Sequence, residues 1–124
     1  MRVLMCGSRG WHNAGAIETV ISGLTAQSED SAKRLTIIHG DSKKGADGLV
    51  DRIARQWGAR VIPVPAQWGR YHAGAGPIRN QQMLDEYVPE QVWAFRATGK
   101  SNGTDDMVTR SKCAGLPTFV VTEA

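Results

Sequence analysis

The sequence has no long hydrophobic run. Its uninterrupted apolar stretches are only a few residues long, as in Val3-Leu4-Met5-Cys6 or Phe119-Val120-Val121, whereas a helix needs about 20 apolar residues to cross a bilayer. These lengths predict that no helix spans a membrane. The apolar stretch after Met1 and Arg2 is also too short for the hydrophobic region of a secretory signal, and its pattern is typical of a first β-strand. We therefore expect a cytoplasmic protein with no membrane partner.

Cysteine is scarce, and charge of one sign is not concentrated anywhere. Cys6 and Cys113 match no spacing typical of a metal or redox site. We expect both thiols to be buried in a reducing compartment, and we expect no metal and no cofactor. The 15 Lys and Arg against 12 Asp and Glu give a net charge of +3 without a basic block. Nucleic acid is therefore a weaker candidate partner than a small molecule.

What the chain does contain is a regular alternation of strand and helix patterns. Hydrophobic residues make up 41% of the sequence and charged residues 22%, which is typical of a globular protein. We find no internal repeat or linker, so residues 1–124 are expected to form a single α/β domain. The strands are predicted at Arg2–Cys6, Leu35–His39, Arg60–Pro65, Gln91–Phe95 and Thr118–Thr122. Most are continuous apolar runs, which favours a parallel sheet covered on both faces.

Proline predicts the order of the strands. Pro63 and Pro65 interrupt the third strand and Pro117 opens the fifth, and proline is tolerated mainly at sheet edges because it lacks an N–H. A doubly wound, Rossmann-like sheet with the order 3-2-1-4-5 places both strands at the edges. Its switch point lies between the first and fourth strands, where a crevice opens at their carboxyl ends. We expect the ligand there.

Four amphipathic helices are predicted between the strands. The first carries Ile17, Val20, Ile21 and Leu24 on one face after Asn13 as N-cap, and the second carries Ala46, Leu49, Val50, Ile53, Ala54 and Trp57 before a stop at Gly58. The third is predicted from Pro77 to about Glu86, with Ile78, Met83, Leu84 and Tyr87 facing inward. The fourth is predicted from Thr104 to Ala114, before Gly115.

Two connections after predicted strands are rich in glycine and in groups that bind phosphate. Gly7-Ser8-Arg9-Gly10-Trp11 offers backbone N–H groups, a hydroxyl and a guanidinium, although a tight turn explains the same residues. His39–Asp47 leads into the second helix through Gly40 and Gly45 and lacks the spacing of a Walker loop. Asp47 is expected either to cap that helix or to accept hydrogen bonds from a ribose or from Arg9.

Two further connections follow the third and fourth strands. The loop from Gln67 to Gly76 is a candidate lid, and Arg79 and Asn80 after it are expected to reach phosphate or sugar. The fourth connection, residues 96–106, contains Thr104, which can cap the helix or bind phosphate, and two acids that can cap or take part in chemistry. Trp57 and Trp93 fit the apolar faces, which leaves Trp11 and Trp68 to stack on a base.

Taken together, these connections resemble the SLOG superfamily, in particular its small YspA-like branch related to YpsA. The elements that carry the resemblance are Gly7-Ser8-Arg9, His39-Gly40, Gly45-Ala46-Asp47, Ala66-Gln67-Trp68, Ala75 to Asn80 with Met83, and Gly103 to Met107. They run in the family's order along nearly the whole chain. The resemblance implies a Rossmann-like domain that binds nucleotides or nucleotide-derived molecules, including ADP-ribose-like signals.

The superfamily also contains LOG-type phosphoribohydrolases and DNA-binding DprA-like proteins. The resemblance to the enzymes implies that Arg79 anchors a phosphate and that Asp106 stands where their catalytic glutamate would. Two departures set this chain apart from the enzymes. The segment before Gly103 is Thr98-Gly99-Lys100-Ser101-Asn102, where the enzymes have Pro-Gly-Gly. The side chain of Asp106 is one methylene shorter than the glutamate of the enzymes.

Three functions therefore remain open. The chain binds a nucleotide as a sensor or scavenger, it cleaves the N-glycosidic bond of a nucleoside monophosphate, or it binds single-stranded nucleic acid. Self-association is expected only by analogy with relatives. The expected ligand-binding residues are Gly7, Ser8, Arg9, Gly40, Gly45, Asp47, Trp68, Gly76, Arg79, Asn80, Gly99, Gly103 and Thr104, and the expected catalytic residues are Arg79 and Asp106.

Overall fold

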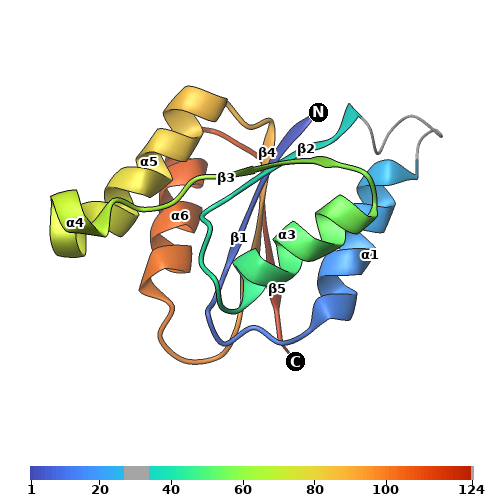
Figure 1. Cartoon of the computed structure of the whole chain (residues 1–124), viewed down its shortest axis with the longest axis horizontal. Coiled ribbons are helices and arrows are strands. Elements are labelled where there is room, and N and C mark those ends of the chain that lie inside the picture. Colours follow the sequence, from blue (N-terminus) through green and yellow to red (C-terminus); the bar gives the residue numbers. More distant parts are fainter. Residues whose placement is uncertain (27–33, 124) are drawn as a thin grey trace.

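The computed structural model describes residues 1–26 and 34–123 and contains a five-stranded parallel sheet (Figure 1). The strands are β1 (Arg2–Gly7), β2 (Thr36–His39), β3 (Arg60–Pro63), β4 (Gln91–Arg96) and β5 (Thr118–Thr122). Their order is β3-β2-β1-β4-β5, which confirms the predicted Rossmann-like fold. β3, which ends at Pro63, and β5, which directly follows Pro117, lie at the edges. β3 ends at Pro63 rather than Pro65, because only its first four residues pair with β2.

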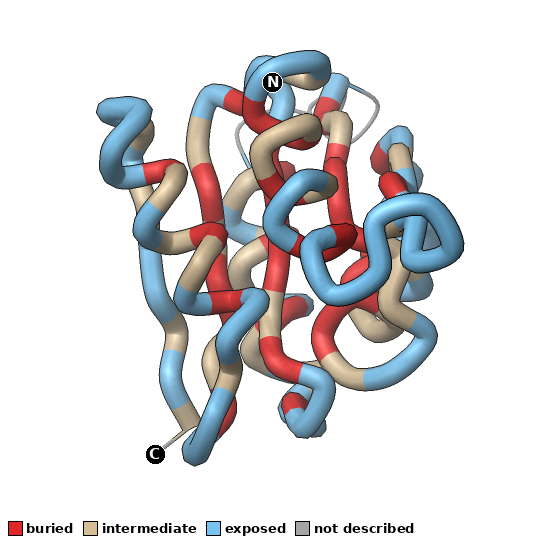
Figure 2. Tube along the Cα trace, turned by 90° about the vertical axis from the view of Figure 1, so that its left-hand side faces the viewer, coloured by how far each residue is buried: buried red, intermediate tan, exposed pale blue. Residues whose placement is uncertain are grey.

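The helices are α1 (Ala14–Thr25), α3 (Ala46–Gln56), α4 (Trp68–Tyr71), α5 (Ala75–Tyr87) and α6 (Asn102–Cys113), with a 3₁₀ turn, η1 (His72–Gly74), between α4 and α5. In Figure 1, α1 and α3 cover one side of the sheet, and α5 and α6 cover the other. Alternate residues of each central strand point to opposite faces. Val3 and Met5 therefore pack toward α1 and α3, whereas Leu4 and Cys6 pack toward α5 and α6. Figure 2 shows this core as a buried band along the central strands.

The predicted caps of α1 and α3 are confirmed. The Asn13 side chain accepts a hydrogen bond from the N–H of Ala16 at 3.1 Å, and Gly58 follows α3 with φ of +83°. The starts of the later helices are corrected. α5 begins at Ala75, two residues before Pro77, and α6 begins at Asn102 rather than Thr104.

Several predicted core and loop positions are also corrected. Ile78 is 44% exposed because it lies on the outer side of α5, and Trp57 is 37% exposed at the end of α3. The lid loop contains α4 and η1 instead of being irregular. Cys113 is exposed at the end of α6, whereas Cys6 is buried, and both are free thiols.

Trp11 is not available to stack on a base. Its side chain is 1% exposed, its indole N–H donates to the carbonyl of Asn13 at 2.9 Å, and its ring lies 5.6 Å from that of Phe95. The loop after β1 therefore folds this residue into the core. Trp93 is partly buried and stacks on Phe119 at the β4–β5 pair. Within the described ranges, no helix has the length and apolar character required to cross a membrane.

Candidate functional site

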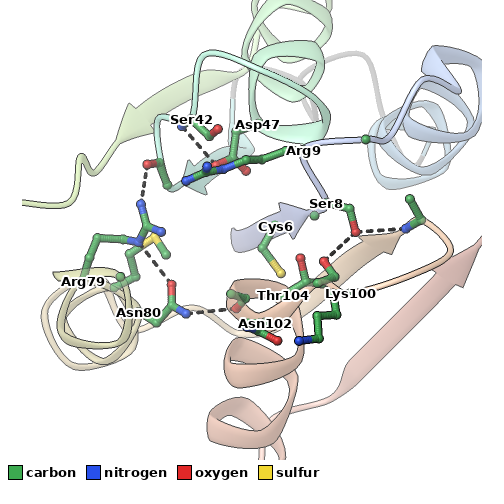
Figure 3. Close-up of a pocket in the computed structure, with 18 of the residues that line it drawn as sticks. Cys6, Ser8, Arg9, Ser42, Asp47, Arg79, Asn80, Lys100, Asn102 and Thr104 are labelled. Carbon is green, nitrogen blue, oxygen red and sulfur yellow. Dashed lines mark hydrogen bonds between the residues drawn. The ribbon is translucent and has the colours of Figure 1, made fainter. Parts of the chain in front are cut away.

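A cavity of about 430 Å³ opens at the carboxyl ends of β1 and β4, on the side of the sheet covered by α5 and α6 (Figure 3). This is the switch point of the sheet, because the chain leaves β1 toward α1 and leaves β4 toward α6 on the opposite face. The volume lies within the range of small-molecule sites, roughly 300–1,000 Å³.

The structure brings most of the predicted site residues to this cavity. Its lining includes Gly7, Ser8, Arg9, Gly40, Asp47, Trp68, Gly76, Arg79, Asn80, Gly103 and Thr104. Gly45, Gly99 and Asp106 do not line it. The sequence interpretation missed six polar or thiol side chains that do: Cys6, Ser42, Thr98, Lys100, Ser101 and Asn102. The position of the last three, immediately before the fourth predicted helix, is the signal that would have included them.

Ser8 ties the connection after β1 to the end of β4. Its hydroxyl accepts a hydrogen bond from the N–H of Ala97 at 3.0 Å and lies 2.7 Å from the hydroxyl of Ser101. The preceding residue must be glycine, because a Cβ at Gly7 would lie 2.4 Å from the Cβ of Ala46 and 2.5 Å from the carbonyl oxygen of Phe95. Close packing of β1, β4 and α3 thus sets the floor of the cavity.

Gly45 does not line the cavity but packs against the connection after β1 that does. The N–H of Ala46 donates to the carbonyl of Ser8 at 3.1 Å, which joins the start of α3 to the β1 connection. Gly45 has φ of +71°, and a Cβ there would lie 2.3 Å from the Ser8 oxygen and 2.5 Å from the Cα of Arg9. Its role is to let α3 approach the turn that carries Arg9.

Arg79 reaches the cavity from α5 and is anchored through two of its nitrogens. Its Nε donates to the side-chain oxygen of Asn80 at 3.1 Å, and Nη1 donates to the carbonyl of Gly40. Burial lowers the pKa of Arg79, and nearby Arg9 acts in the same direction, against the opposing effect of Asp47. Among the described residues, Nη2 has no hydrogen-bond partner, so one arm of the guanidinium remains available to an anion.

Arg9 approaches the same hollow from the opposite wall. In Figure 3 its side chain extends from the β1 connection toward Arg79. No hydrogen bond of the Arg9 guanidinium is found within the described part of the chain. Two guanidinium groups at one cavity repel each other, and an anion between them would relieve that repulsion.

Among the described residues, Asp47 is the one carboxylate of the lining. It is 6% exposed, and its Oδ2 accepts a hydrogen bond from the N–H of Ser42 at 3.2 Å. It therefore does not cap α3 through its side chain, which corrects one of its two predicted roles. Its Oδ1 is buried without a partner among the described residues. Burial raises the pKa of Asp47, opposed by the hydrogen bond from Ser42 and by the positive charge of Arg79.

The raised pKa predicts a pH effect that Asp47→Asn removes. Above about pH 4, the usual aspartate value, the unfolded chain loses this proton while the folded chain still holds it. Folding stability then falls as pH rises toward the folded-state pKa, with a slope of up to about 1.4 kcal/mol per pH unit. Urea unfolding across this window should show the wild type losing stability relative to Asp47→Asn. A difference between the two proteins that is independent of pH would contradict the prediction.

The start of α6 forms the wall opposite the two arginines. Ser101 is the N-cap residue, but its side chain makes no capping hydrogen bond and contacts Ser8 instead. In the part of the chain that the structure describes, the N–H groups of Asn102, Gly103 and Thr104 have no acceptor. These residues line the cavity with Lys100 (Figure 3). Free N–H groups at a helix start attract anions.

Asn80 and Asp106 connect α5 to α6 beside the cavity. The Asn80 amide donates to the carbonyl of Gly103 at 3.1 Å and to Oδ2 of Asp106 at 2.9 Å. The same oxygen accepts a hydrogen bond from Nε of Arg110 at 2.8 Å. Partial burial raises the pKa of Asp106, but the hydrogen bonds from Arg110 and Asn80 outweigh it and leave the pKa lowered. Asp106 is thus held as a carboxylate in a contact between helices.

Trp68 stands at the mouth of the cavity. It is 50% exposed, and a Cβ at Gly76 would lie 3.6 Å from its ring. One edge of the indole therefore lies beside Gly76, and half of the residue is exposed to solvent. Gly99, with φ of +87°, belongs to a turn outside the lining, where its carbonyl accepts a hydrogen bond from Arg96 at 3.1 Å. Within residues 1–26 and 34–123, no three His, Cys, Asp or Glu side chains gather closely enough to hold a metal ion.

Comparison with known proteins gives one family match. A family model described as YAcAr, the YspA, cpYpsA-related SLOG family, matches residues 1–71. The matched part covers more than half of the chain and includes β1, β2, β3 and the connections that carry Arg9 and Asp47. No curated protein matches the sequence.

Proposed function

The chain belongs to the YspA, cpYpsA-related SLOG family, and on that basis we propose that it binds a nucleotide or nucleotide-derived ligand as a sensor or scavenger. The ligand occupies the cavity at the carboxyl ends of β1 and β4. The observation that carries the proposal is the pairing of Arg9 and Arg79 with the uncapped start of α6 around one hollow. Guanidinium groups and helix N–H groups both bind oxyanions, and phosphate is the oxyanion of a nucleotide.

The remaining lining residues suit the other parts of a nucleotide. Nη2 of Arg79 and the N–H groups at the start of α6 bind the phosphate. Asp47 accepts hydrogen bonds from sugar hydroxyls, because a carboxylate is an acceptor with several lone pairs and only one contact here. Trp68 provides a half-exposed indole for the base, where stacking is worth about 1–3 kcal/mol.

Binding without turnover is favoured over phosphoribohydrolysis by the position of Asp106. A carboxylate that stabilises an oxocarbenium-like ribose must face the sugar. The Asp106 side chain instead binds Asn80 and Arg110 and is absent from the cavity lining. We therefore assign Asp106 to the packing of α5 against α6 rather than to chemistry.

Native mass spectrometry of the purified protein with AMP, GMP, CMP, UMP and ADP-ribose tests the proposal. We expect a saturable complex with at least one of them, with the ligand mass unchanged after incubation. Absence of every complex would overturn the proposal. Binding only to single-stranded oligonucleotides, with a steep salt dependence, would instead support the nucleic-acid function.

The Asp106→Asn variant separates a binding protein from an enzyme. We expect it to bind nucleotides with an affinity within about threefold of the wild type, because Asn keeps the shape of the side chain and Asp106 does not line the cavity. Chromatography of incubated AMP should show no free adenine with either protein. Release of adenine by the wild type and its loss in Asp106→Asn, with binding retained, would show that the protein is a hydrolase.

A further inference from the structure

We propose that His39 is a positioning residue for the ligand cavity, which holds the turn between β2 and α3 in the shape that places Arg79 and Asp47. This inference rests on the proposed function. His39 is the last residue of β2, is 1% exposed and does not line the cavity. It therefore acts on the ligand only through the residues that it orders.

Both ring nitrogens of His39 have partners, and the partners determine its tautomer. The N–H of Asp41 donates to Nδ1 at 3.0 Å, so Nδ1 must carry a lone pair rather than a proton. The ring proton is then on Nε2, which lies 2.8 Å from Oδ2 of Asp51. A neutral imidazole has one donor and one acceptor. His39 uses the donor toward α3 and the acceptor toward the turn.

The turn held by Nδ1 requires such support. Asp41 has φ of +56°, a left-handed conformation that is unfavourable for a residue other than glycine. On either side of it, the carbonyl of Gly40 accepts a hydrogen bond from Nη1 of Arg79, and the N–H of Ser42 donates to Oδ2 of Asp47. Both cavity residues are thus attached to the one turn that the imidazole holds.

Glycine at position 40 makes this attachment close. A Cβ there would lie 2.6 Å from Nη1 of Arg79 and 3.0 Å from Oδ2 of Asp47. The turn therefore lies between the two side chains with no spare room. A displacement of its backbone must move the anchored guanidinium, the carboxylate or both.

Asp51 favours the same tautomer, because its Oδ2 lies 2.8 Å from Nε2 and can accept the ring proton in a hydrogen bond. Asp51 is held in place by Nε of Arg55 at 2.8 Å, and Asp41 is paired with Lys43 at 3.2 Å. Asp47 and Arg79 lie beyond the turn. A second proton, on Nδ1, would point a donor at the N–H of Asp41 and break the contact. The cavity as described requires the neutral ring with its proton on Nε2.

Two substitutions separate the roles of the two nitrogens. In His39→Asn the side-chain oxygen can occupy the place of Nδ1 and accept from Asp41, but the contact with Asp51 is lost. In His39→Gln the amide can reach toward Asp51, but the acceptor for Asp41 is lost. Affinity is measured by isothermal titration with AMP and ADP-ribose, and folding by thermal unfolding.

We expect His39→Gln to lower affinity about tenfold, the effect of one buried hydrogen bond, and His39→Asn to stay within about threefold of the wild type. Equal affinities in His39→Gln and the wild type would overturn the inference and leave the proposed function intact. A wild type that binds none of AMP, GMP, CMP, UMP and ADP-ribose would overturn both.

A spectroscopic measurement keeps the inference testable if either variant fails to fold. Nitrogen-15 NMR of the wild-type imidazole distinguishes the two neutral tautomers without any ligand. We expect a protonated Nε2 and an unprotonated Nδ1 coupled by its hydrogen bond to the amide of Asp41. A proton on Nδ1 would contradict the proposed role.

Discussion

Replacing Arg79 with alanine is expected to weaken binding of AMP and ADP-ribose by about 1.5–3 kcal/mol, or roughly 10- to 150-fold. The substitution removes the free Nη2 arm and the positive charge from the cavity. It also leaves the carbonyl of Gly40 and the side-chain oxygen of Asn80 without their donor. Isothermal titration gives the affinity, and thermal unfolding separates a local loss from a general one.

Two further variants make the Arg79 result specific. Arg79→Lys keeps the positive charge but replaces the planar guanidinium, which binds Asn80 and Gly40 through two nitrogens, with a single ammonium group. We therefore expect an intermediate loss of affinity. Arg52→Ala removes the same charge from an exposed position on α3 that does not line the cavity, and we expect affinity close to that of the wild type. A folded Arg79→Ala protein with wild-type affinity would show that this guanidinium does not hold the phosphate.

Gly45→Ala is expected to lower the free energy of unfolding by about 3 kcal/mol or more. Two costs add at this position. The backbone has φ of +71° and ψ of −140°, a conformation that costs a residue with a Cβ about 1–3 kcal/mol. The new Cβ would also lie 2.3 Å from the oxygen of Ser8 and 2.5 Å from the Cα and oxygen of Arg9, and overpacking costs typically about 1–3 kcal/mol.

Gly58→Ala is the matched control for Gly45→Ala. Gly58 also has a positive φ, of +83°, but a Cβ there would have nothing within 4 Å. We expect only the conformational cost, about 1–2 kcal/mol. Urea unfolding measures the loss of stability in both variants. An unchanged dependence of the free energy of unfolding on urea concentration would confirm that the variants and the wild type unfold between equivalent states. Equal losses in the two variants would show that the contact with Ser8 and Arg9 adds nothing.

Much of the fold was predictable because its signals are local or follow from general rules of chain connection. Short apolar runs alternating with amphipathic stretches indicated a parallel sheet, and the structure confirms it. Pro63 and Pro117 indicated the edge strands because proline has no N–H to donate to a neighbouring strand. The predicted start of α5, at Pro77, was wrong by two residues. The helix begins at Ala75, because Ala75 and Gly76 also adopt helical backbone.

The structure brings most of the predicted site residues to one cavity and leaves Gly45, Gly99 and Asp106 outside its lining. Connections at the carboxyl ends of neighbouring parallel strands must meet, so Arg9 and Arg79 were expected at one hollow, and both line it. Whether a side chain faces the hollow or a neighbouring helix depends on contacts between residues distant in sequence. Asp106 binds Arg110 and Asn80, and Trp11 packs on Phe95. The residues next to Asp106 and Trp11 in the sequence do not predict either contact.

Residue order and composition alone established the sheet, its strand order and the edge where polar loops collect, because those follow from periodicity, proline chemistry and chirality. Packing in three dimensions settled the rest. It engaged Ser101 with Ser8 and placed His39 beneath the turn that holds Arg79. Among the described residues, it left the start of α6 without a side-chain cap and one buried oxygen of Asp47 without a partner. Such contacts join residues far apart in the chain, and they form only once the close-packed core has brought their backbones together.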